Sequence, residues 1–176
     1  TNGATADDAG YAALLAAAKA TGAPVLVARP GQTIDLGDGA RLDILSAGGD
    51  ASLADNDASV VARLTYGELS VLLTGDAGEA AEAALLAGGQ LAPTVVLKAG
   101  HHGANTSSGA AFLAAVRPQV VVISVGADNS YGHPAPAMLQ RAAEVGATVL
   151  RTDEIGTIEL ISDGERMWWE AGTAGE

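Results

Sequence analysis

Cysteine is absent from this chain of 176 residues. Its absence excludes disulfide bonds, thiolate nucleophiles and zinc sites that depend on cysteine ligands. Aromatic residues are scarce as well, at 3% of the chain, which argues against a platform on which nucleic-acid bases stack.

Basic residues are also few. Nine Lys and Arg stand against 21 Asp and Glu, so the formal net charge is −12, and the acidic residues are spread along the chain. A diffuse negative field repels phosphate at long range, so the composition excludes a basic DNA-binding groove. Long apolar runs are missing too, because Tyr11–Ala18 and Val120–Val125 fall well short of the roughly 20 residues of a membrane-spanning helix.

The length fits one domain or one truncated domain. The segment Thr1–Asp8 has no initiator Met and no basic stretch typical of a signal peptide, so we interpret it as a cut inside a larger protein. We predict a single partial domain over residues 1–170 and a disordered tail over residues 171–176.

The N-terminal part of the chain predicts one helix, one short strand and two hairpins. The helix is expected over Tyr11–Lys19, capped by Asp7 or Asp8, and the strand over Pro24–Ala28. The hairpins are expected over residues 32–45 and 60–74, with a small polar loop at Ser46–Asp57 between them.

From residue 69 onward, strands alternate with helices. Strands are predicted over residues 69–74, 95–98, 120–125 and 148–151, and helices over 78–87, 108–116 and 135–145, the second of them capped by Ser107 or Ser108. A hairpin over residues 156–170 closes the chain, with one face of Trp168-Trp169 buried. The fold class is therefore α/β (α+β), in which β-hairpins precede a βαβαβαβ segment of a mixed and largely parallel sheet.

Polar residues follow the predicted parallel strands. Asp76 follows the first strand, His101 and His102 follow the second, and His133 follows the third. The carboxyl ends of parallel strands share one edge, where open α/β sheets bind their ligands. Histidine and carboxylate without cysteine are the ligands of zinc, manganese or iron in hydrolytic sites.

Each of these residues also has a simpler interpretation. Asp76 could cap the following helix, and the three histidines could be ordinary turn and loop residues. The segment Asn105–Ser108 could hold a phosphate on free backbone amides or serve as an N-cap. Arg151 could contact an anionic substrate, although we favour an ion pair with Asp153 or Glu154.

Four blocks of the sequence resemble the metallo-β-lactamase-like domain of ComEC-type DNA-internalisation competence proteins. They are SVLLTGD at 70–76, VLKAGHHG at 96–103 with TSS at 106–108, ISVG at 123–126 with YGHP at 131–134, and RTDEIGTI at 151–158. Their order and spacing fit that family, residues 56–66 match more loosely, and the resemblance covers nearly the whole chain.

The resemblance implies an αββα sandwich whose N-terminal part is missing, with a hydrolytic site for one or two divalent metals, zinc or manganese. It places Asp76, His101, His102 and His133 in the catalytic site, with Asp76, His133 and His102 as metal ligands. Contacts to substrate or phosphate are expected from the neighbouring polar residues Asn105, Thr106, Ser107, Tyr131, Asn56 and Ser59.

The resemblance also implies a partner and a location. The expected activity is that of a nuclease that acts on DNA through its metal ions during DNA uptake. The chain would be a soluble domain of a polytopic bacterial cytoplasmic-membrane protein, on the extracytoplasmic side, and the rest of that protein would be its second partner.

The main metal-binding motif of the superfamily, a His-x-His-x-Asp-His type run, is absent, and no histidine precedes His101. We therefore expect this fragment to lack most of the metal ligands, to hold no metal of its own and to be inactive alone. Two alternatives stay open. One is a metal-free structural or interaction module, and the other is a hydrolase of the same fold that acts on an ester or lactone.

Overall fold

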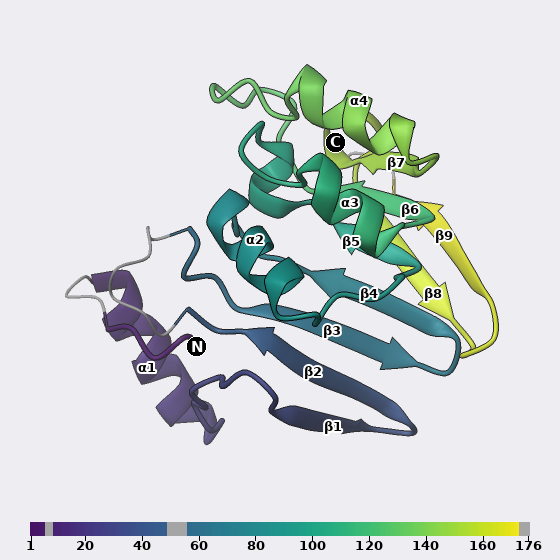
Figure 1. The fold of residues 1–176 in the computed structure, drawn as a ribbon. Helices are drawn as coiled ribbons and strands as arrows, with labels where there is room; N and C mark the ends of the chain where they lie inside the picture. The colour runs from purple at the N-terminus through teal and green to yellow at the C-terminus, as the bar shows by residue number, and fades with distance from the viewer. Residues whose placement is uncertain (6–8, 49–55, 173–176) are drawn as a thin grey trace.

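Seven strands form one sheet in which neighbours follow the order of the chain, from β1 to β7 (Figure 1). The structure is a computed structural model that describes residues 1–5, 9–48 and 56–172. The strands are β1 (Thr33–Gly37), β2 (Ala40–Ser46), β3 (Val61–Tyr66), β4 (Leu69–Leu73), β5 (Val96–Lys98), β6 (Val120–Ile123) and β7 (Thr148–Arg151).

The pairing confirms the predicted change from hairpins to parallel strands. The pairs β1–β2, β2–β3 and β3–β4 are antiparallel, whereas β4–β5, β5–β6 and β6–β7 are parallel. Parallel neighbours need a crossover connection, and here α2 (Glu79–Ala87), α3 (Ala110–Val116) and α4 (Pro136–Glu144) supply it.

The described residues build three layers. Helices α2, α3 and α4 lie on one face of the large sheet, and a second sheet of β8 (Ile158–Ser162) and β9 (Met167–Ala171) lies on the other face (Figure 1). Helix α1 (Ala9–Thr21) contains no buried residue. This mixed α/β arrangement is consistent with the expected metallo-β-lactamase fold.

The main core lies between the large sheet and the three crossover helices. Leu72, Leu97 and Val121 from the strands pack with Leu85 and Phe112 from the helices, and all five are almost fully buried. The central strands are therefore covered by apolar side chains of the helices. This packing fixes the strands relative to one another, so that their carboxyl ends lie along one edge of the sheet. A smaller cluster of Ile44, Ala47 and Ala62 lies on β2 and β3.

Several local predictions are wrong. Residues 24–28 form no strand, because their contacts are with Thr1 and not with a sheet edge, and Val25, Leu26 and Val27 stay about half exposed. Helix α3 begins after Gly109, so neither Ser107 nor Ser108 is its N-cap residue. Trp168 and Trp169 both keep more than 40% exposure, so neither face of that pair is buried.

Two predictions concern the ends of the chain. Ala171 belongs to β9 instead of to a disordered tail, and residues 173–176 lie outside the described residues. The proposed caps Asp7 and Asp8 also lie outside them. Two short helices were not predicted, η1 (Gly100–Gly103) and α5 (Thr152–Ile155). Across the described ranges, no helix has the length and apolarity needed to cross a membrane.

Candidate functional site

Asp76 and all three histidines meet at the carboxyl edge of the parallel strands. Together with Tyr131 they line a cavity of about 250 Å³, which we call the histidine pocket. Asp76 comes from the loop after β4, His101 and His102 from η1 after β5, and Tyr131 and His133 from the loop after β6. Residues up to 57 positions apart in the chain thus share one small cavity because parallel strands end at the same edge.

The His102 ring is oriented from both sides. Its Nδ1 lies 2.7 Å from the carbonyl oxygen of Ser124, and because a carbonyl only accepts, Nδ1 donates. The neutral ring therefore carries its lone pair on Nε2, which lies 3.7 Å from Oδ1 of Asp76. Metal-binding histidines are held in this way, with one ring N–H donated to a backbone carbonyl and the lone pair of the other nitrogen left for the metal.

His101 has the opposite tautomer. The side-chain amide nitrogen of Asn56 lies 3.3 Å from Nδ1 of His101, and an amide nitrogen only donates. Nδ1 therefore accepts, and the neutral ring carries its proton on Nε2. His101 therefore offers a hydrogen-bond donor at Nε2, whereas His102 offers a lone pair there.

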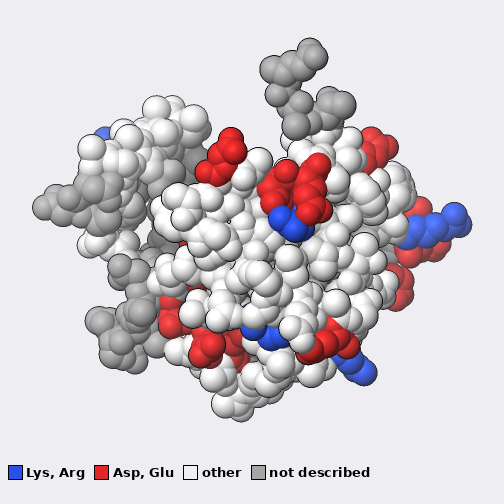
Figure 2. Space-filling model, turned by 90° about the horizontal axis from the view of Figure 1, so that it is seen from above, with Lys and Arg blue, Asp and Glu red and all other residues white. Residues whose placement is uncertain are grey.

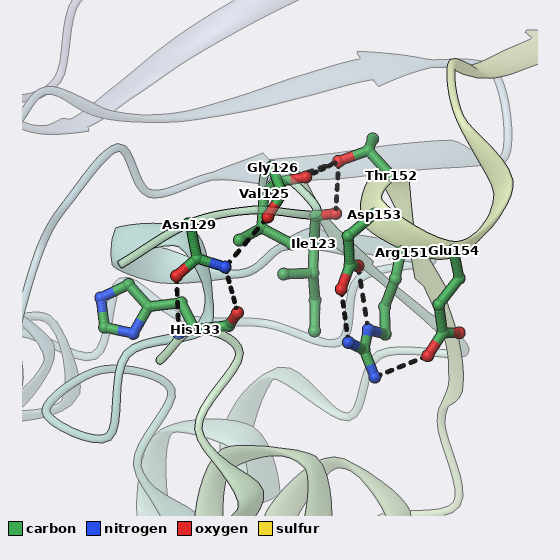
Figure 3. Close-up of polar contacts among 9 residues, drawn as sticks. All are labelled: Ile123, Val125, Gly126, Asn129, His133, Arg151, Thr152, Asp153 and Glu154. Atoms are coloured by element: carbon green, nitrogen blue, oxygen red, sulfur yellow. Dashed lines mark hydrogen bonds and ion pairs between the residues drawn. The ribbon is translucent and has the colours of Figure 1, made fainter. Parts of the chain in front are cut away.

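His133 is held through its backbone by Asn129. The Asn129 amide donates to the carbonyl oxygens of Gly126 and His133 and accepts from the backbone nitrogen of His133, at 2.8–3.0 Å, as Figure 3 shows. The His133 ring stacks on Tyr131 and contacts His101 edge-on. Its Nδ1 is buried without a hydrogen-bond partner among the described residues.

The surroundings of His133 favour its neutral form. Burial lowers the pKa of His133 below its ordinary value, and His101 and His102 lower the pKa further. A neutral imidazole keeps a lone pair available, which metal binding and proton acceptance both require.

The carboxylate of Asp76 does not cap a helix. Its backbone nitrogen donates to Oγ of Ser59, while the amides of Gly78 and Ala81 at the start of α2 donate to Asp57 at 2.9 and 3.2 Å. The capping interpretation of Asp76 is therefore wrong. The side chain that caps α2 is Asp57, which the sequence analysis placed in a polar loop. The side chain of Asp76 remains free to face His102.

Tight backbone packing sets the positions of His101 and His102. Both residues adopt the left-handed conformation, at φ 46° and 55°. Gly103 follows at φ +82°, and a Cβ built on it would lie 2.8 Å from Cβ of Pro134. Only glycine permits that approach, so the histidine turn packs directly against the loop that carries His133.

The segment Asn105–Ser108 is occupied by contacts within the protein. The Arg141 guanidinium donates to the carbonyl oxygens of Asn105, Ser107 and Ser108, and the Ser107 hydroxyl donates to the carbonyl of Ala77.

Two backbone amides just before α3 are also engaged, because those of Ser108 and Gly109 donate to the carboxylate of Glu82. Thr106 is exposed. Phosphate contacts by Asn105, Thr106 and Ser107 stay a prediction, as do contacts by Asn56 and Ser59.

Arg151 forms the ion pair that the sequence favours. It donates to both carboxylate oxygens of Asp153 and lies 2.7 Å from Glu154 (Figure 3). The Asp153 partner raises the pKa of Arg151, and Arg151 lowers the pKa of Asp153. This guanidinium is therefore engaged within the protein.

Lys98 is a residue of the site that sequence reasoning did not assign. It ends β5, its Nζ donates to the carbonyl of Ala99, and it lies within electrostatic range of Asp76. Burial lowers the pKa of Lys98, while the charge of Asp76 opposes that shift. The sequence feature that could have indicated Lys98 is a single basic residue at the end of an apolar strand.

Basic side chains are few on the face of the described residues that Figure 2 shows. Figure 2 shows one face of the molecule, on which acidic side chains are scattered and basic side chains are fewer. This distribution agrees with the net charge of −12.

Comparison with known proteins gives the family. Residues 8–127 match the metallo-beta-lactamase superfamily. The chain belongs to the metallo-beta-lactamase superfamily. It is also 39% identical over 125 residues to competence protein ComA of Neisseria gonorrhoeae, a match that covers 70% of the chain and 18% of that protein.

Two further relatives are similar to the chain over a comparable part of its length. The chain is 32% identical over 149 residues to ComE operon protein 3 of Bacillus subtilis, covering 83% of the chain and 19% of that protein. It is 36% identical over 122 residues to recombination protein 2 of Haemophilus influenzae, covering 69% of the chain and 15% of that protein. The chain thus spans less than a fifth of the length of these relatives, and its resemblance to ComEC-type competence proteins is confirmed.

Members of the metallo-beta-lactamase superfamily usually bind divalent metals, so the histidine pocket must be compared with that requirement. Two ligands of one tetrahedral zinc ion lie about 3.3 Å apart, close to the 3.7 Å between Asp76 and His102. A catalytic zinc takes three protein ligands, however, and the described ranges contain no group of three or more His, Cys, Asp or Glu arranged to hold a metal. These residues therefore do not fit a metal ion by themselves.

Proposed function

We propose that this chain is part of a metal-dependent phosphodiester hydrolase domain of a ComEC-like competence protein that acts on DNA during its uptake. One observation carries the proposal. Nε2 of His102 and Oδ1 of Asp76 face each other at 3.7 Å, and the Ser124 carbonyl holds the His102 ring in the tautomer of a metal ligand. The remaining ligands would come from outside the described residues.

Two residues near the Asp76–His102 pair have separate roles in this proposal. His101, which carries its proton on Nε2, donates to a substrate oxygen, and Lys98 lowers the cost of holding the Asp76 carboxylate beside a phosphate. The charge of −12 opposes binding of DNA at long range, so the affinity must arise from local contacts. We place the domain on the extracytoplasmic side of the membrane, attached to the rest of a polytopic protein.

The test is nuclease activity of the full-length protein on single-stranded DNA with manganese or zinc. We expect Asp76→Ala and His102→Ala each to lower the activity by about 100-fold or more, because each removes a metal ligand. Asp128→Ala, an exposed carboxylate after β6, is the matched control and should keep the activity. Full activity in both ligand variants would contradict the proposal.

A second function is favoured by the small number of possible metal ligands among the described residues. With only Asp76 and His102 paired, the chain could act as a metal-free structural or interaction module. Calorimetric titration with zinc and manganese separates the two functions. A site of micromolar or tighter affinity that disappears in His102→Ala would rule out the metal-free module.

A further inference from the structure

A second cavity adjoins the histidine pocket and has a different lining. It has a volume of about 340 Å³, and we call it the tyrosine pocket. His102, Tyr131 and His133 line both cavities, so the two are neighbours. The other lining residues come from the segments that follow β6 and β7, namely Ser124, Val125, Gly126, Asn129 and Thr152.

Two polar side chains of the tyrosine pocket, Asn129 and Thr152, are used within the protein. Asn129 bonds to Gly126 and His133, as Figure 3 shows. The Thr152 hydroxyl donates to the carbonyl of Val125 and accepts from its amide. A ligand in this pocket therefore cannot use these two side chains, and its binding depends mainly on shape and apolar contact.

Tyr131 supplies a flat surface at this pocket. Its ring lies nearly parallel to that of His133, with an interplanar angle of 18° and a centroid distance of 6.0 Å, and the residue is 81% exposed. One face of the Tyr131 ring thus stacks on the ring of His133, whose backbone is hydrogen-bonded to Asn129. The other face of the Tyr131 ring is open to solvent. A supported and exposed aromatic face is suited to stacking with another ring.

The cations near this edge offer little to a phosphate backbone. Arg141 is bound to backbone carbonyls, Arg151 to Asp153 and Glu154, and Lys98 donates to Ala99. Because charge contributes so little here, a nucleic acid needs another source of local affinity. A single stacked base provides one, and it needs only one aromatic residue, in contrast to the extended platform that the composition argues against.

We propose that the tyrosine pocket binds one unpaired base of single-stranded DNA, stacked on Tyr131, while the adjoining phosphate accepts a hydrogen bond from Nε2 of His101 in the histidine pocket. The inference rests on the proposed function, since it names the form of DNA on which that function acts. The pocket volume suits one ring-bearing group, and the bases of a duplex have both faces covered by their neighbours. Stacking tolerates any base, because every base has a flat π face.

The experiment measures binding of a short fluorescent thymidine strand to the 176-residue chain, with a chelator present so that no cleavage takes place. An abasic strand of the same length is measured in parallel. We expect Tyr131→Ala to weaken binding of the thymidine strand by about 5- to 100-fold and to leave the weak binding of the abasic strand unchanged. Tyr131→Phe keeps the ring and should restore the affinity.

Trp168→Ala is the matched control, because it removes an exposed aromatic side chain that lines neither pocket. Raising the salt concentration from 50 to 200 mM should lower the affinity less than about 10-fold, since few phosphates are neutralised. The inference is overturned if the wild-type chain does not distinguish the two strands, if Tyr131→Ala changes nothing, or if Tyr131→Phe binds as weakly as Tyr131→Ala.

This outcome is separable from that of the proposed function. If the full-length protein cleaves no DNA but Tyr131 still determines strand binding, the hydrolase proposal fails and the stacking site stands. If Asp76→Ala abolishes cleavage but Tyr131→Ala binds the strand like the wild-type chain, only the stacking site fails.

Discussion

The three histidines differ at the scale of single atoms. His102 donates through Nδ1 to a carbonyl, His101 accepts at Nδ1 from an amide, and Nδ1 of His133 is buried without a partner among the described residues. Side chains of the same type thus differ at Nε2, where neutral His102 has a lone pair and neutral His101 carries a proton. Sequence reasoning grouped them, because residue type alone does not show which neighbour contacts which ring nitrogen.

Glu82 is the buried charge that organises the start of α3. Burial raises the pKa of Glu82, against the opposing effect of the Gly109 and Ser108 amides and of Arg141. The folded state therefore holds this proton at pH values where the unfolded chain, with a pKa of about 4.5, has lost it. The free energy of unfolding should decrease as the pH rises from 4.5 through the raised pKa.

Urea unfolding at several pH values tests this expectation. Glu82→Gln should remove a dependence of at most about 1.4 kcal/mol per pH unit, because one proton is involved. Glu144→Gln, which changes an exposed glutamate on α4, should keep the wild-type slope. Equal slopes in the wild type and in Glu82→Gln would contradict the assignment.

At the scale of elements, the site depends on how closely two loops pack. Gly103, the last residue of η1, lies at φ +82° against Pro134 in the loop that carries His133. Gly103→Ala should lower the free energy of unfolding by about 1–3 kcal/mol, through the left-handed backbone and the clash with Pro134. Chemical denaturation measures this change.

Gly126→Ala is the matched control for that substitution. Gly126 has no positive φ, and a Cβ built on it meets nothing within 4 Å. Its substitution should change the free energy of unfolding by less than about 0.5 kcal/mol. If Gly103→Ala were as mild as Gly126→Ala, the close packing of the two loops would not be essential.

The excess of acidic residues acts on the whole molecule. A net charge of −12 makes the folded chain repel itself, and salt screens that repulsion. Raising sodium chloride from about 20 to 300 mM, over which the Debye length falls by a factor of about four, should therefore raise the melting temperature by a few degrees. Thermal unfolding followed by circular dichroism measures it, and a melting temperature that falls with salt would mean that ion pairs such as Arg151–Asp153 dominate.

The secondary structure that the sequence predicts well is the part with strong local patterning. The hairpin turning at Gly37–Gly39 and the alternation of strands and helices from Leu69 to Arg151 were both recovered. The strand at residues 24–28 was wrong because its apolar residues find no sheet edge, and that depends on distant parts of the chain. The helix cap at Asp57 was missed for the same reason, since it lies 21 residues before Gly78.

The sequence by itself determined the βαβαβαβ order, and with it the edge at which Asp76 and the histidines meet, because hydrophobic periodicity and short crossovers are local properties. Only the tertiary structure decided which ring nitrogens are free, that Glu82 and Arg141 occupy the start of α3, and that Tyr131 leans on His133 with its other face open. These features arise from contacts between residues far apart in the chain, at distances of a few ångströms that no residue pattern encodes.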